Sequence, residues 1–293
     1  MTTLPVRPVS PARRSLRLFA RSPGAMIGLG IVLLVTFAAL FAPFVAPYDP
    51  VAFNPADRLQ GPSLQHLLGT DLYGRDTFSR VIHGGRISLS VAALSVMLAL
   101  LAGGVLGVIA GFFGGRGLLG RLLDTVIMRL TDILLAFPAV LLAIALLAFL
   151  GGGFWNLTLA IAVAFGAPFA RVARASVLSL QGVMFVEAST ALGASSARLL
   201  WRHVVPNALA PLIVEVTLRL AYAILAEAAL SFLGLGTPPP APAWGQMIAD
   251  GRPLLEQAPW ASIGPGLAIM VTVLGFNLLG DGLRDALDPR IQS

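Results

Sequence analysis

The hydrophobic positions along the chain fall in long, almost unbroken runs that are separated by shorter polar stretches. A helix needs about 20 apolar residues to cross the hydrocarbon core of a bilayer, whereas a barrel strand needs only about ten residues of alternating polarity. The runs have the helical length, so we expect an all-α integral membrane protein with six transmembrane helices. The six apolar windows are 26–46, 87–112, 129–150, 155–176, 208–235 and 262–282.

Composition agrees with a membrane protein. Hydrophobic residues make up 57% of the chain and charged residues 12%, against roughly 25% charged residues in an average soluble domain. The net charge of +6 comes from Arg alone, which is more typical of cytoplasmic loops than of nucleic-acid binding. The chain has no Cys, which excludes disulfides and thiolate chemistry, and its three His residues lack ligand spacing, so no metal site is expected.

The distribution of Arg predicts the orientation in the membrane. Fourteen Arg residues fall in segments that would share one side with the N-terminus, and five fall on the other side. The positive-inside rule therefore places both termini in the cytoplasm. The first window follows an Arg-rich start but is too long for a signal peptide, so we expect an uncleaved helix. The predicted divisions are a tail 1–25, a first transmembrane helix 26–46, an extracytoplasmic loop 47–86, a core 87–282 with five helices, and a tail 283–293.

A polar stretch, FVEASTALGASSARLLWRHVVPN, interrupts the apolar pattern before the fifth window. Glu187 can lie near the start of a short helix, where the helix dipole favours an anion. Gly193 is expected to end that helix, and one of the next two Ser residues to cap a second helix. Pro206 is expected to stop the second helix before the next span. We further expect Leu199, Leu200 and Trp201 to present an exposed apolar surface that fits a groove in a partner.

The same stretch resembles the EAA loop of ABC-importer permeases, which docks the membrane subunit onto its ATPase. The resemblance lies in Glu-Ala-x-x-x-x-Gly followed by Pro thirteen residues after the Gly, with Ser189 and Val205 as mild departures. Blocks 66–90, 226–248 and 275–290 resemble the C-type permeases of dipeptide, oligopeptide and nickel importers. The resemblance implies an ATPase-coupling loop over 187–206 that uses Glu187, Ala188, Gly193, Leu199, Leu200, Trp201, Arg202 and Pro206.

This resemblance implies a type I importer-like permease fold that forms half of a pathway for di- or oligopeptides. The implied partners are a second homologous permease subunit in a heterodimer, two ABC ATPase subunits, an extracytoplasmic solute-binding protein and membrane lipid, without nucleic acid. The chain has no GxxxxGK[ST] phosphate loop, so we expect no enzyme activity and no cofactor, with ATP bound by the partner subunits. The implied location is the inner membrane of a bacterium or archaeon.

Charged residues inside the windows are candidates for function, because charge at membrane depth is costly. Glu227 has no local basic partner and is expected to line the translocation pathway or to make a helix-packing hydrogen bond. Asp132 is a second pathway candidate, with Arg129 as its expected partner, and Pro138 should kink the same helix. Two further pairs are expected to be structural, Glu215 with Arg219 and Asp281 with Arg284.

The extracytoplasmic segments carry further patterns. Asp71 with Arg75 and Asp76 with Arg80 have the i,i+4 spacing of ion pairs on a surface helix, and a role in meeting the binding protein is the alternative. The Pro-rich segment 237–244 is either a shelf on the outer face or a connector. Glycines four residues apart, at 24 and 28 and at 103, 107 and 111, permit close helix contact.

Other functions remain open at this point. A permease for nickel or another small solute fits the same resemblance. An ion-driven secondary transporter would use Glu227 and Asp132 as proton carriers, and would have an ordinary polar loop at 187–206. A membrane enzyme is disfavoured, because the windows contain no catalytic His, Asp and Ser constellation.

Overall fold

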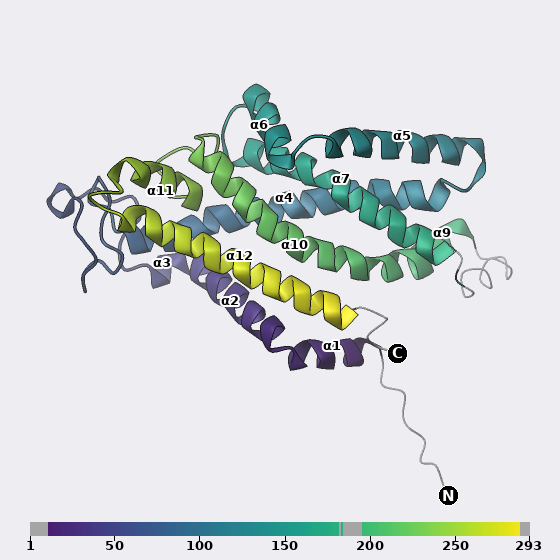
Figure 1. Cartoon of the computed structure of the whole chain (residues 1–293), viewed down its shortest axis with the longest axis horizontal. Coiled ribbons are helices and arrows are strands. Elements are labelled where there is room, and N and C mark those ends of the chain that lie inside the picture. Colours follow the sequence, from purple (N-terminus) through teal and green to yellow (C-terminus); the bar gives the residue numbers. More distant parts are fainter. Residues whose placement is uncertain (1–10, 182, 184–194, 288–293) are drawn as a thin grey trace, which may run out of the picture.

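The computed structural model describes residues 11–181, 183 and 195–287, and in these residues every regular element is a helix. Figure 1 shows long helices running side by side, with shorter ones at the two ends of the bundle. The α-helices are α1 (Pro11–Arg21), α2 (Pro23–Leu40), α3 (Ala42–Val45), α4 (Thr77–Phe113), α5 (Gly117–Leu135), α6 (Ala139–Leu150), α7 (Phe154–Gln181), α9 (Ser196–Leu199), α10 (Val205–Phe232), α11 (Trp244–Gly251) and α12 (Trp260–Leu287). The short elements are the 3₁₀ turns η1 (Pro55–Asp57) and η3 (Arg252–Leu254) and the π-helical turn η2 (Leu200–Val204).

Five helical segments are long and apolar enough to cross a membrane, and the bent pair of α5 and α6 makes a sixth if it counts as one span. The all-α prediction is confirmed. Five of the six predicted windows contain one long apolar helix each, and the third window falls on the bent pair of α5 and α6. We call the end of the bundle that holds α1, α9 and the last turns of α12 the inner end, and the end that holds α3 and α11 the outer end (Figure 1). The Arg distribution predicts that the inner end is cytoplasmic.

The third predicted span is not one kinked helix. The chain bends by 93° between α5 and α6, and Pro138 caps the start of α6 instead of lying within a helix over 129–150. Pro disfavours helical backbone in the preceding residue and has no N–H to donate, so a helix readily ends before it. At 1.5 Å per residue, the 12 residues of α6 extend about 18 Å, which is too short to cross a hydrocarbon core of about 30 Å alone.

Two boundaries near the N-terminus also differ from the sequence prediction. The segment 1–25 was predicted as a tail, but it contains α1, which ends where Ser22 caps α2 through a bond from the Ala25 N–H to its Oγ. The first span ends at Leu40, and the apolar run up to residue 46 continues as the separate short helix α3. Pro43 lies in the first turn of α3, a position that Pro favours.

Helices α4 and α7 approach closely along a seam of small residues. A Cβ placed on Gly103 would lie 2.0 Å from the Gly166 carbonyl oxygen, and one placed on Gly107 would lie 2.2 Å from the Ala170 carbonyl oxygen. Residues four apart share one face of a helix, so Gly103, Gly107 and Gly111 form a continuous contact line. Only Gly permits this approach, and the glycine spacing in the sequence therefore marks a packing seam.

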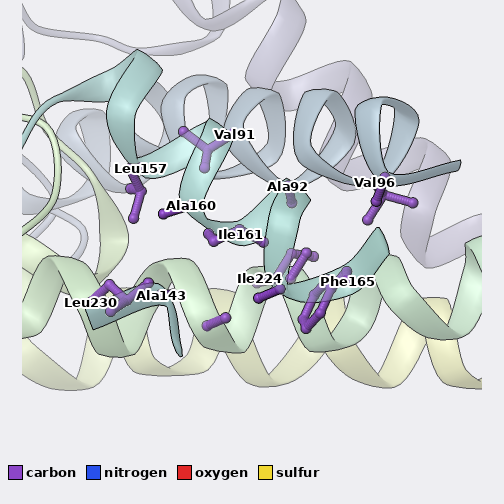
Figure 2. Packing of buried hydrophobic residues seen from close by; sticks show 14 of the residues in the cluster. Val91, Ala92, Val96, Ala143, Leu157, Ala160, Ile161, Phe165, Ile224 and Leu230 are labelled. Carbon is purple, nitrogen blue, oxygen red and sulfur yellow. The ribbon is translucent and has the colours of Figure 1, made fainter. Parts of the chain in front are cut away.

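The main hydrophobic core lies between α4, α7, α10 and α6. Figure 2 shows Val91, Ala92 and Val96 of α4 facing Leu157, Ile161 and Phe165 of α7, with Ile224 and Leu230 of α10 close by. Ala143 of α6 belongs to the same cluster. This core fixes α10 against α4 and α7, and α10 connects the inner end of the bundle with the outer end.

Candidate functional site

The described part of the predicted coupling loop begins at Ser195, at the inner end. Glu187, Ala188 and Gly193 lie outside the described residues. The Ser195 Oγ accepts a hydrogen bond from the Arg198 N–H at 3.4 Å, so Ser195 caps α9 as the sequence predicted. A helix that begins in the loop therefore has a defined start.

Pro206 does not end that helix, which corrects the sequence prediction. Helix α9 continues through η2 into α10, and the Val205 N–H donates to the Leu200 carbonyl, five residues earlier. In a regular α-helix the Pro206 ring would clash with the carbonyl four residues earlier, and a wider π-helical turn relieves such a clash. The Asn207 side chain donates to the His203 carbonyl at 2.6 Å. From Ser196 onward, the described part of the loop and the fifth span are thus one continuous helical run.

The apolar residues of this helix do not all face solvent. Leu199 is 4% exposed and packs with Phe112, Val177 and Val204, so the prediction that Leu199 is exposed is wrong. Leu200 is half-buried against the same cluster, whereas Trp201 is 71% exposed. Arg202 and Pro206 are also exposed. The surface available to a partner centres on Trp201, while Leu199 anchors the helix to the bundle.

Helix α5 is tied to α7 and α9 by contacts that the sequence analysis missed. The Arg174 guanidinium binds both carboxylate oxygens of Asp124, at 2.6 and 2.7 Å. Arg116, just before α5, donates to the Ser196 Oγ at 2.7 Å and lies over the Phe112 ring. The partners are 50 and 80 residues apart in the chain, so sequence spacing gives no signal for them.

Asp132 pairs with Arg171 of α7 at 2.8 Å, not with Arg129 as predicted. The two side chains are 54% and 59% exposed, close to the bend between α5 and α6. An ion pair on a spanning element is costly in contact with lipid, so it faces water or protein instead.

Comparison with known proteins decides between the functional alternatives. Residues 103–293 match the family model described as the binding-protein-dependent transport system inner membrane component. Residues 10–62 match the N-terminal transmembrane domain of oligopeptide transport permease C. The chain belongs to this permease family.

Full-length relatives resemble the permease closely. A dipeptide transport system permease protein of Alkalihalophilus pseudofirmus is 45% identical over 285 residues, which cover 97% of this chain and 92% of the relative. A di/tripeptide transport system permease protein of Pseudomonas aeruginosa is 46% identical over 290 residues, with 97% and 94% coverage. A glutathione transport system permease protein of Pectobacterium atrosepticum is 42% identical over 285 residues, with 97% and 93% coverage.

A solved structure shares the fold of the permease at low sequence identity. The chain matches an inward-facing structure of the MetNI methionine ABC transporter with a TM-score of 0.59 and 19% identity, covering 72% of this chain and 97% of the other. The predicted ABC-importer permease fold is thus confirmed.

Family membership also settles the class of function. The permease is a multi-pass membrane subunit of an ABC importer, and it works with an ATPase and a substrate-binding partner. ATP hydrolysis belongs to the separate ATPase subunit, so the permease is not itself an enzyme. The ion-driven alternative is set aside.

Glu227 lies in the core of the permease. Its side chain is fully buried, and the Ser231 Oγ donates to Glu227 Oε1 at 2.7 Å. Ser88 of α4 and Trp244 of α11 form a second buried hydrogen bond, in which the Trp244 N–H donates to the Ser88 Oγ at 3.2 Å. The other carboxylate oxygen, Oε2, is buried and has no hydrogen-bond partner in the described residues. The helix-packing hydrogen bond is therefore present through Oε1, and the role of Glu227 in the pathway stays a prediction.

Replacing Glu227 tests that geometry. Gln keeps the size and the acceptor oxygen, so we expect Glu227→Gln to match the wild type in thermal stability and uptake. Leu removes the acceptor and leaves the buried Ser231 hydroxyl unsatisfied, at a cost of about 1–3 kcal/mol. Thermal unfolding of the purified protein should therefore show a lower Tm for Glu227→Leu alone. A stable Glu227→Gln variant without uptake would show that the carboxylate acts in transport.

Of the two other predicted ion pairs within helices, one is present in the structure and one is not. Arg219 Nε lies 2.6 Å from Glu215 Oε1, as the one-turn spacing predicted. Asp281 and Arg284 are both exposed, and in the described residues they form no ion pair with each other, so this pair is not confirmed. Two solvated side chains on a helix surface have little to gain from holding one geometry.

Of the two ion pairs predicted in the outer segments, one is present and the other is replaced by a helix cap. Arg75 Nε lies 2.7 Å from Asp71 Oδ2, but the pair closes a turn and not a helical surface. Asp76 does not pair with Arg80. It caps α4, accepting the Ser79 N–H at 2.7 Å, and its other oxygen lies 2.9 Å from His66 Nδ1. An acid directly before a helix accepts the free backbone donors of the first turn, and that use prevails here over the pair with Arg80.

Arg80 turns to other partners at the outer end. Its Nη1 donates to the Pro50 carbonyl at 2.9 Å, and its Nε lies 3.6 Å from Asp71 Oδ2. The Pro-rich segment 237–244 adjoins this region. Pro239 and Pro240 line a cavity with the charged turn, and Trp244 is buried, so the segment packs on the outer end of the permease.

Proposed function

We propose that the permease imports di- or oligopeptides across the inner membrane of a bacterium. The observation that supports this cargo is the similarity over nearly the full chain to permeases named for dipeptide, di/tripeptide and glutathione transport. The match of the N-terminal residues to the oligopeptide permease C domain points the same way. None of the three relatives described above is named for nickel.

We infer that the permease forms half of the pathway and that a second homologous permease subunit forms the other half in a heterodimer. The exposed Asp132–Arg171 pair supports this inference, because it needs water or protein beside it in the membrane. The short helix α6 supports it as well, since bent helices in membranes occur where protein or a water-filled cavity adjoins them. This face of the permease is incomplete without a partner.

Two ATPase subunits supply the energy in this proposal, and the permease holds no cofactor of its own because ATP binds to those subunits. The loop 187–206 receives the ATPase, and its second helix continues without interruption into α10. Movement at the loop can therefore reach the outer end through one helical run. Alternation between inward-open and outward-open states follows as the ATPases close and separate.

Peptide uptake by the complete transporter tests the proposal. We expect cells that lack other peptide importers to take up labelled dipeptide when they express the permease with its partner subunits and binding protein. Uptake should stop when the phosphate-loop Lys of the ATPase subunits is replaced. It should continue when an ionophore collapses the ion gradients at constant ATP. Uptake of nickel without peptide, or peptide uptake without ATPase activity, would contradict the proposal.

A further inference from the structure

A charged cavity of about 260 Å³ opens at the outer end of the permease. The turn 71–77 and the start of α4 form one wall, α11 forms the opposite wall, and the Pro-rich segment covers one side. We call this cavity the outer socket and define it by Asp71, Arg75, Thr77, Arg80, Gln246 and Asp250. Nothing in the coupling of ATP hydrolysis to transport described above uses it.

The wall formed by the turn carries an excess positive charge. Asp71 Oδ1 accepts the backbone N–H groups of Tyr73 and Arg75, at 2.8 and 3.0 Å. Asp71 Oδ2 lies 2.7 Å from Arg75 Nε and 3.6 Å from Arg80 Nε. Two guanidinium groups thus share one carboxylate that is already saturated with donors. Bidentate recognition of carboxylates is the usual use of such a preorganised guanidinium.

Thr77 adds to this wall a hydroxyl group that is unsatisfied within the described residues. Its side chain is buried and lines the socket, and its Oγ1 has no hydrogen-bond partner in the part of the chain that the structure describes. A buried hydroxyl without a partner costs about 1–3 kcal/mol. An occupant with an acceptor oxygen would satisfy the hydroxyl. The wall therefore fits a carboxylate.

The opposite wall is rigid and carries the opposite charge. Gln246 Nε2 donates to Asp250 Oδ1 at 2.8 Å across one turn of α11. Helix α11 is itself fixed at its start, because the Trp244 indole N–H donates to the Val81 carbonyl at 2.8 Å. The negative wall favours an occupant that presents its carboxylate to the turn and a donor group to α11.

Aromatic side chains extend the socket toward the surface of the outer loop. The Arg75 guanidinium lies 4.5 Å from the centre of the Tyr73 ring, and the Phe53 ring lies 6.2 Å from Tyr73. Tyr73 is 48% exposed and Phe53 is 65% exposed. Both lie outside the segments that are long and apolar enough to cross a membrane. Exposed aromatic residues beside a half-buried Arg are typical of a protein interface.

We propose that the outer socket receives a carboxylate side chain of the extracytoplasmic binding protein, while Phe53 and Tyr73 pack against apolar surface around it. This inference rests on the proposed function, because the binding protein is the soluble partner that reaches the outer end. A protein is favoured over a free solute, since the aromatic rim extends the contact well beyond the cavity.

Two substitutions and a matched control test the socket in the complete transporter in nanodiscs. We expect Arg75→Gln to weaken the affinity for the binding protein by about tenfold or more, and Thr77→Val by about three- to tenfold. Arg58→Gln removes the same charge from an exposed position of the same loop and should change the affinity less than about twofold. Thr77→Ser keeps the hydroxyl and should bind as the wild type does.

Thr77→Val separates binding from folding. The substitution removes a hydroxyl that has no hydrogen-bond partner among the described residues, so the free transporter should keep its Tm or gain slightly. A purely structural role for Thr77 predicts unchanged affinity instead. Arg75→Gln also removes a contact to Asp71, and its Tm is therefore measured alongside its affinity.

An acidic residue of the binding protein should be coupled to Arg75 in a double-mutant cycle. Its neutralisation should weaken binding to the wild-type transporter but have no further effect on Arg75→Gln. Wild-type affinity of both Arg75→Gln and Thr77→Val would overturn the inference. Competition by free dipeptide, with no effect from any acidic residue of the binding protein, would also overturn it. If the wild-type transporter imports no peptide, the proposed cargo fails, while the affinity measurements still decide on the socket.

Discussion

Replacing Gly103 by Ala is expected to destabilise the permease by about 1–3 kcal/mol or more, whereas replacing its neighbour Gly104 by Ala should leave stability unchanged or slightly higher. A methyl group on Gly103 would lie 2.0 Å from the Gly166 carbonyl oxygen of the opposite helix. Backbone cannot yield as a flexible side chain can, so α4 and α7 would have to move apart. On Gly104 the nearest atom is Leu100 Cδ1 at 3.7 Å, which is an ordinary contact.

Thermal unfolding of the two variants in the same detergent measures this difference. Gly166→Ala serves as a second control from the facing helix, because a Cβ on Gly166 would meet no atom within 4 Å. We expect a lower Tm for Gly103→Ala alone. Equal Tm values for Gly103→Ala and Gly104→Ala would mean that the two helices are not in backbone contact at this level. The two variants are directly comparable, because both add one methyl group, at neighbouring positions of the same helix.

Five of the six predicted windows contain one long apolar helix each, and they could be predicted from the sequence because hydrocarbon burial depends on the length and polarity of each run. The sequence predicted a kink at Pro138 but not a bend as large as 93°. A Pro in a spanning helix is compatible with a mild kink or a full break, and neighbouring helices decide between them. The glycine spacing of α4 indicated a close helix contact, but it did not identify α7 as the partner, because that depends on the tertiary structure.

The charged residues show the same division. Glu215 and Arg219 are one turn apart in one helix, and the spacing alone predicts their contact. Asp132 and Arg171 are 39 residues apart, so no local pattern could have indicated their pair. Asp76 is a different case, because a signal was present. Asp is among the residues that helix N-caps prefer, and that preference favours the cap of α4 as the alternative to a pair with Arg80.

Leu199 and Trp201 lie two residues apart in the same helical run but on different sides of it, and this difference is the basis of the second prediction. Leu199 packs into the cluster of Phe112, Val177 and Val204, whereas Trp201 is exposed in the same predicted coupling loop. If the ATPase docks at this loop, Trp201 is the exposed large apolar side chain that the described part of the loop, 195–206, offers to a groove in it. Trp is among the residues that most often dominate binding energy at protein interfaces.

Trp201→Ala should therefore weaken the affinity of the permease for its ATPase subunits by more than about tenfold, a loss of about 2 kcal/mol, with little change in Tm. Leu199→Ala should instead lower stability by about 2–5 kcal/mol through a buried cavity. Trp155 is 65% exposed at the start of α7, at the outer end, so Trp155→Ala controls for loss of an exposed Trp away from the loop. The affinity is measured by titrating ATPase subunits onto nanodiscs, and peptide-dependent ATP hydrolysis is measured on the same samples. Stable Trp201→Ala with wild-type ATPase affinity would mean that the docking surface does not centre on Trp201, because no other apolar side chain of η2 is exposed to replace it.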